Sequence, residues 1–109
     1  MDIQPKTAKV YLTLVDKDSG VVADDIAMGE IDLARKIYDL MRGDPDNELG
    51  MDRREDVLDN IGYDVIFCSK GLVEQLLKDT EVVKVDESEK RKIAGHPMGG
   101  YVWQLRIFH

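Results

Sequence analysis

Residues 42–56, RGDPDNELGMDRRED, hold the densest run of carboxylates in the chain. Counted from Asp44, acids stand at positions 1, 3, 5, 9 and 12, and calcium loops between two helices use the same positions for ligands. Two departures argue against a calcium site. Leu49 occupies position 6, where the sharp turn of such a loop needs glycine, and Pro45 stiffens the entry.

The alternative interpretation of this run is polar wrapping between two helices. Asp44-Pro45-Asp46-Asn47 is a turn pattern, and Asp52 and Glu55 have the spacing of an acidic capping pair at a helix start. The resemblance to an EF-hand is therefore partial, and EF-hands usually occur in pairs, whereas this sequence offers no second loop. We predict no bound metal and no cofactor.

Cys68 and His96 are the residues that could carry nucleophilic or general-base chemistry. Cys68 lies between a predicted strand and a predicted helix, where amides can stabilise a thiolate, but Lys70 is its only activating neighbour in the sequence. A free cysteine with this setting more commonly packs as a small hydrophobe. His96 stands in a glycine-rich segment without a partner acid at a telling spacing, so a flexible hairpin connection is the default interpretation. If the segment has a function, we expect a contact loop formed by His96, Met98 and Tyr101.

Hydrophobic periodicity predicts the elements that would position these residues. We expect a hairpin over 9–27, helices over Glu30–Arg42 and Lys70–Asp79, the latter capped by Ser69, and a shorter helix over Arg53–Asn60. We also expect strands over Tyr63–Cys68, Val82–Val85 and Tyr101–Phe108, with 86–100 as a long exposed connection that begins with a helical turn.

This order, ββααβαββ, predicts one α+β domain over residues 1–109. It would be a two-layer sandwich: a mainly antiparallel sheet of about five strands with two to three helices on one face. Strands 63–68 and 82–85 could form a local parallel pair. The long aromatic terminal strand would need its edge covered, which suggests a homodimer through an edge strand as a further possibility.

Charge excludes several classes of function. The net charge is -7, and the segment from Asp16 to Asp64 alone holds fifteen acids and six bases. Such a surface repels phosphates, so direct nucleic-acid binding is disfavoured. No apolar run approaches the length of a membrane span, and one cysteine rules out an internal disulfide framework, which together favour a cytoplasmic protein.

We therefore expect a non-enzymatic, acidic protein-binding module that covers a basic surface of a partner. Small acidic inhibitors, among them bacterial immunity proteins and phage anti-defence proteins, act in this way. The alternative is a small enzyme or small-ligand-binding domain that uses Cys68 or His96. The residues expected to contact the partner are Asp39, Asp44, Asp46, Glu48, Asp52, Glu55 and Asp56.

Overall fold

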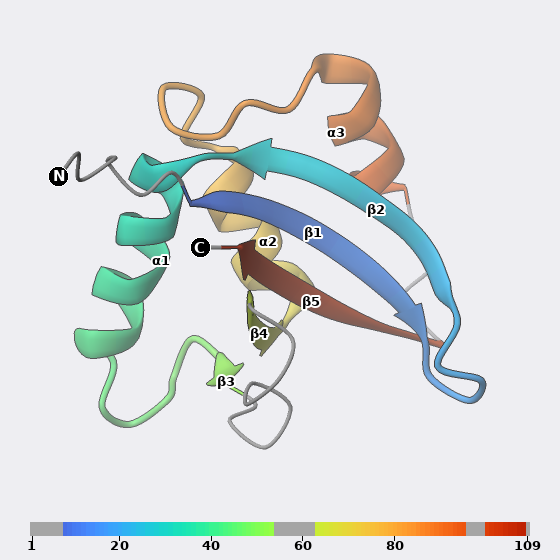
Figure 1. Cartoon of the computed structure of the whole chain (residues 1–109), viewed down its shortest axis with the longest axis horizontal. Helices are drawn as coiled ribbons and strands as arrows, with labels where there is room; N and C mark the ends of the chain where they lie inside the picture. Colours follow the sequence, from blue (N-terminus) through green and yellow to red (C-terminus); the bar gives the residue numbers. More distant parts are fainter. Residues whose placement is uncertain (1–7, 54–62, 96–99, 109) are drawn as a thin grey trace, which may run out of the picture.

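A computed structural model describes residues 8–53, 63–95 and 100–108 (Figure 1). Five strands and three helices follow one another along this part of the chain. They are β1 (Lys9–Asp16), β2 (Val22–Gly29), α1 (Ile31–Arg42), β3 (Asp52–Arg53), β4 (Tyr63–Cys68), α2 (Lys70–Leu77), α3 (Glu87–Ala94) and β5 (Tyr101–Phe108).

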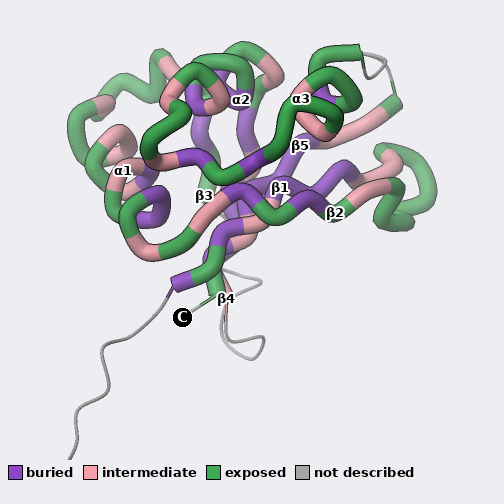
Figure 2. Tube along the Cα trace, turned by 90° about the horizontal axis from the view of Figure 1, so that it is seen from above, coloured by how far each residue is buried: buried purple, intermediate pink, exposed green. Residues whose placement is uncertain are grey.

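The strands form one sheet in the order β2-β1-β5-β4-β3, and every neighbouring pair runs antiparallel. Figure 2 shows α1, α2 and α3 on the same side of this sheet. The predicted α+β class, with a five-stranded antiparallel sheet and helices packed against it, is confirmed. No helix in the described part of the chain is both long and apolar enough to cross a membrane.

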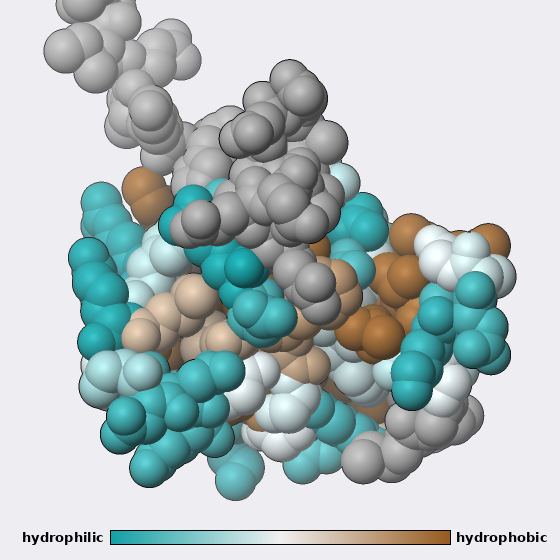
Figure 3. Space-filling view, turned by 90° about the horizontal axis from the view of Figure 1, so that it is seen from below, coloured by the Kyte–Doolittle hydropathy of each residue, from teal (hydrophilic) through white to brown (hydrophobic). Residues whose placement is uncertain are grey.

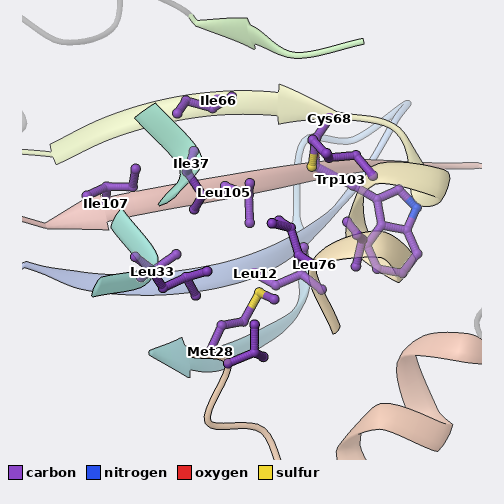
Figure 4. Close-up of a cluster of buried hydrophobic side chains, with 14 of the residues drawn as sticks. Leu12, Met28, Leu33, Ile37, Ile66, Cys68, Leu76, Trp103, Leu105 and Ile107 are labelled. Carbon is purple, nitrogen blue, oxygen red and sulfur yellow. The ribbon is translucent and has the colours of Figure 1, made fainter. Parts of the chain in front are cut away.

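The core lies between the sheet and the helices. On β1, Val10, Leu12 and Leu14 are fully buried, and the register sets Leu12 opposite Leu105 of β5. Alternation therefore works as predicted, because successive side chains of a strand point to opposite faces. Figure 4 shows the apolar side chains of the sheet meeting those of α1 and α2: Leu12, Met28, Leu33, Ile37, Ile66, Leu76, Leu105 and Ile107.

The other face of the sheet carries an aromatic cluster across three strands. The rings of Tyr63 and Phe108 stack with centroids 4.5 Å apart, and Tyr11 meets Phe108 edge-on at 5.5 Å. The Arg106 guanidinium carbon lies 5.6 Å from the centre of the Tyr63 ring, within cation–π range. These contacts join β1, β5 and β4 on the face of the sheet that points away from the helices.

Residues 82–85 are not the strand that their valines predict. The backbone N–H groups of Val82 and Val83 bond back to Asp79, Val82 to its side chain and Val83 to its carbonyl. Because those donors are used in a turn, only the Lys84 N–H reaches the sheet, where it donates to the Met28 carbonyl of β2. Val83 and Val85 are still buried, so the segment packs like a strand without pairing like one, and no parallel pair forms with β4.

Two further expectations need correction. Arg53 lies in β3 and pairs with Ile66, so no helix begins there; the rest of the predicted helix, 54–60, lies outside the described residues. The segment after Asp86, expected to be largely an exposed connection, forms the two-turn helix α3, whose Ile93 is fully buried.

The terminal strand also takes an unexpected place. β5 occupies the middle of the sheet, paired with β1 on one side and β4 on the other, so it offers no free edge. The edge strands are β2 and β3, and a homodimer through an edge strand, which stays a prediction, would have to use one of these. β2 is partly covered, because Lys84 bonds to its end and Lys92 of α3 pairs with Asp24 at 2.7 Å.

Candidate functional site

The acid-bearing loop between α1 and β3, residues 43–51, is a built structure. The two carboxylate oxygens of Asp44 accept the backbone N–H groups of Glu48 and Leu49, each at 2.9 Å. Asn47 and Gly50 take positive φ, 55° and 74°, as residues suited to left-handed turns do. Asp44 therefore holds the turn together from within.

Apolar and polar anchors fix this loop to the rest of the molecule. Met51 is buried in the core, and Leu49 packs against the outside of that core. The hydroxyl of Ser69, which caps α2, also donates to the Leu49 carbonyl at 3.5 Å. The loop is thus joined to the start of α2 as well as to α1.

The predicted partner-binding acids have different situations. Asp46 and Glu48 are exposed on the anchored loop. Asp39 is exposed on α1 but forms an ion pair with Arg42. Asp52 is exposed on β3, opposite Phe67, and a residue inside a strand cannot be the helix cap that we predicted. Glu55 and Asp56 lie outside the described residues. In Figure 3, hydrophilic residues gather at the left of the lower face, where α1 ends and this loop begins.

The calcium interpretation gains no support from this geometry. Both oxygens of Asp44, the first ligand of the predicted series, accept backbone N–H groups. Across the residues that the structure describes, no group of three or more His, Cys, Asp or Glu side chains is arranged to hold a metal ion.

Cys68 lies in the core at the end of β4. Its Sγ is 3.8 Å from the Trp103 carbonyl oxygen, to which the thiol donates. Burial raises the pKa of Cys68 to about 12, because desolvation penalises the thiolate. A buried, protonated thiol is a poor nucleophile, so this position does not favour the alternative function that rests on Cys68, which stays a hypothesis.

The predicted contact loop can be located only at its end. Tyr101 is half-buried at the start of β5, opposite Asp16 of β1. His96 and Met98 lie outside the described residues, so neither their role as contacts nor a catalytic role for His96 is tested.

Sequence reasoning missed a polar network beneath α1. Asp64 of β4 is 7% exposed and accepts hydrogen bonds from the Tyr38 hydroxyl of α1 and from Arg53 of β3, the latter at 3.1 Å. Burial, reinforced by the Asp64 carboxylate, raises the pKa of Tyr38, so its hydroxyl stays protonated and donates. The only signal in the sequence was an acid in the alternation position of β4 that otherwise faces the core.

Comparisons with known proteins add no assignment. No protein-family model, curated protein or solved structure matches this chain.

Proposed function

We propose that this chain is a non-enzymatic, cytoplasmic protein-binding module whose acidic surface covers a basic surface of a partner. The observation that carries the proposal is the anchored loop 43–51, which presents Asp46 and Glu48 to solvent on a fixed backbone. The net charge of the whole molecule, -7, is negative like that of the loop.

A fixed loop suits binding better than a mobile acidic tail. The hydrogen bonds of Asp44 and the burial of Met51 order the backbone before any partner arrives. Binding then loses less conformational entropy, and the exposed carboxylates are free to steer a cationic surface toward the loop. The partner would carry lysine or arginine side chains that pair with Asp46 and Glu48, as the target of a small acidic inhibitor does.

The loop divides the predicted acids into two roles. Asp44 supports the turn with both oxygens, so its reversal would disturb the fold of the loop as well as its charge. The side chains of Asp46 and Glu48 have no hydrogen bond or ion pair with another described residue, and reversing them changes charge alone. Asp46→Lys with Glu48→Lys is therefore the informative double variant.

The test is capture of partners from a lysate of the source organism at low and moderate salt, with three forms of the tagged protein. These are the wild type, the double variant D46K/E48K, and the matched control D18K/E74K. The control makes the same change in net charge at two exposed acids outside the loop. Bound proteins are identified by mass spectrometry, and each candidate is purified for direct titration.

The expected result is one basic protein held by the wild type and by the control, released as salt rises, and lost with the double variant. Titration of the purified partner should then show a slower association rate for the double variant, since steering depends on charge. If D46K/E48K and the control D18K/E74K both lose the partner equally, capture depends on net charge and not on this loop. If D46K/E48K captures as much partner as the wild type, this loop is not the contact surface.

A further inference from the structure

A second feature, a hollow of about 500 Å³, lies where β1 begins and β2 ends, beside the start of α1 and the turn before residue 85. Its volume is in the range of small-molecule sites. It stands apart from the acidic loop, because the length of α1, roughly 18 Å for twelve residues, separates the two ends.

The wall of this hollow is fixed by close backbone packing. A Cβ atom placed on Gly29 would lie 3.1 Å from the Val82 carbonyl oxygen and 3.1 Å from the Leu33 side chain. The neighbouring Lys84 N–H donates to the Met28 carbonyl. Glycine at 29 thus allows the turn to approach the end of β2, and this approach shapes one wall of the hollow.

Charges of both signs line the hollow. Lys9 and Lys84 contribute amines, and Glu30, Asp32 and Glu81 contribute carboxylates. Within the described chain, the side chains of Lys9, Glu30, Asp32 and Glu81 form no hydrogen bond or ion pair. The Lys84 amine donates to the Glu81 backbone carbonyl at 2.7 Å and has no carboxylate partner among the described residues.

Some other charges of the described chain are paired within the protein. Lys36 of α1 meets Asp79, and Lys92 of α3 meets Asp24. The charged side chains around the hollow are exposed, so a ligand of matching charges can pair with them. Tyr11, Ile31 and Val82 add partly buried apolar surface to the same lining.

A ligand of a single charge would meet repulsion from one part of this lining. An anion suits Lys9 and Lys84 but not the three carboxylates, and a cation suits the carboxylates but not the lysines. A zwitterion satisfies both. We propose that the hollow binds a free α-amino acid with an apolar side chain, its carboxylate toward the lysines, its ammonium toward the carboxylates, and its side chain against Tyr11, Ile31 and Val82.

The test uses three probes that differ only in charge: L-leucine, 4-methylpentanoate, which lacks the ammonium, and 3-methylbutylamine, which lacks the carboxylate. Each is titrated into the ¹⁵N-labelled full chain and followed by amide chemical shifts. Leucine should give saturable shifts at Gly29, Ile31 and Val82. Each analogue should bind at least about tenfold more weakly, since it loses one of the two charge interactions.

Variants then assign the charges. Glu81→Gln should weaken leucine binding and leave the weak binding of 4-methylpentanoate unchanged or make it stronger. The double variant Lys9→Met with Lys84→Met should also weaken leucine binding, and it should leave the weak binding of 3-methylbutylamine unchanged or make it stronger. Glu74→Gln, an exposed change on α2 outside the lining, is the matched control and should leave leucine binding as in the wild type.

The wild-type titration alone can overturn the proposal. Absence of saturable shifts with leucine would refute a small-molecule site for this class, and equal binding of leucine and the amine would reduce the hollow to an acidic patch. Equal binding of leucine and the carboxylate would make it an anion site. None of these results bears on the acidic loop, whose test is partner capture.

Discussion

At the scale of single residues, Cys68 is the clearest case in which position decides chemistry. Burial raises the pKa of its thiol to about 12, so at pH 8 the thiol is almost wholly protonated. We expect iodoacetamide at pH 8 to label the native protein far more slowly than the protein unfolded in guanidinium chloride. Mass spectrometry of both reactions checks this, and equal rates would contradict burial of the thiol.

The network around Asp64 allows a second residue-scale prediction. Tyr38→Phe removes one donor to a buried carboxylate and should lower the free energy of unfolding by about 1 kcal/mol. Tyr11→Phe is the matched control, because the Tyr11 hydroxyl makes no hydrogen bond within the described chain and its loss should cost close to nothing. Urea unfolding of both variants measures the difference. Equal unfolding midpoints would mean that the hydrogen bond from Tyr38 to Asp64 does not contribute to stability.

At the scale of elements, the two short helices depend on their caps. The Asp86 carboxylate accepts the Glu89 N–H at 2.9 Å at the start of α3, and the Ser69 hydroxyl accepts the Leu72 N–H at 3.2 Å at the start of α2. Replacing Ser69 by alanine should lower the free energy of unfolding by about 1 kcal/mol, and replacing Asp86 by alanine should also lower it. Glu74→Ala, an exposed change inside α2, should stay within about 0.5 kcal/mol of wild type in the same urea titrations.

A capping variant with the stability of the wild type would mean that tertiary packing, through Ile93 for α3 or Leu72 for α2, determines helix formation without the cap. The comparison also separates the two helices. α3 buries a single side chain in the core and should be the more sensitive to loss of its cap.

The elements also show what the sequence could and could not predict. Strong local signals succeeded: the alternation of β1 and β5, the apolar stripe of α1 and the cap at Ser69 all depend on neighbours in the chain. The prediction of a strand over Val82–Val85 was wrong because the N–H groups of Val82 and Val83 bond to Asp79 and cannot pair with a strand. The central place of β5 was not predictable because its partners are more than thirty residues away in the sequence.

The candidate site was predictable to a similar degree. Composition and turn residues indicated an acidic loop, and the structure places Asp46 and Glu48 on its surface. The internal role of Asp44 and the network of Asp64 were not predictable, since each depends on which N–H or hydroxyl groups the fold brings to a carboxylate. The hollow beside Gly29 was equally unpredictable, because three stretches of chain that are far apart in the sequence form it.

At the scale of the whole molecule, pH acts on stability through two opposed effects. At neutral pH the net charge is -7, and the excess carboxylates repel one another and destabilise the folded state. This repulsion weakens as the pH falls toward the isoelectric point near 4.7. Against it, the folded structure lowers the pKa of Asp16, Asp79 and Asp86. Backbone N–H groups of the turn after Asp16 cause the first shift, the Lys36 amine the second, and the Glu89 N–H the third.

The direction of the second effect follows from linkage. A carboxyl whose pKa is lower in the folded state contributes stability above its ordinary value of 3.8, and that contribution is lost as the pH falls from there through the folded pKa. Lys92 behaves conversely: Asp24 raises its pKa, so its contribution is present below 10.5 and is lost only as the pH rises beyond that value.

Together these effects predict a stability maximum on the acidic side of neutrality. The urea midpoint should rise as the pH is lowered from about 8 to about 5 and fall steeply below about 4, where the three aspartates take up protons on unfolding. Asp86→Asn, which keeps a capping oxygen but cannot ionise, should flatten the fall at low pH. Added salt should shrink the rise between pH 8 and 5, because that part is long-range repulsion. A midpoint that instead declined steadily from pH 8 to pH 5 would mean that the acidic surface does not destabilise the fold at neutral pH, and that its charges are balanced within the protein by interactions of the kind seen between Lys92 and Asp24.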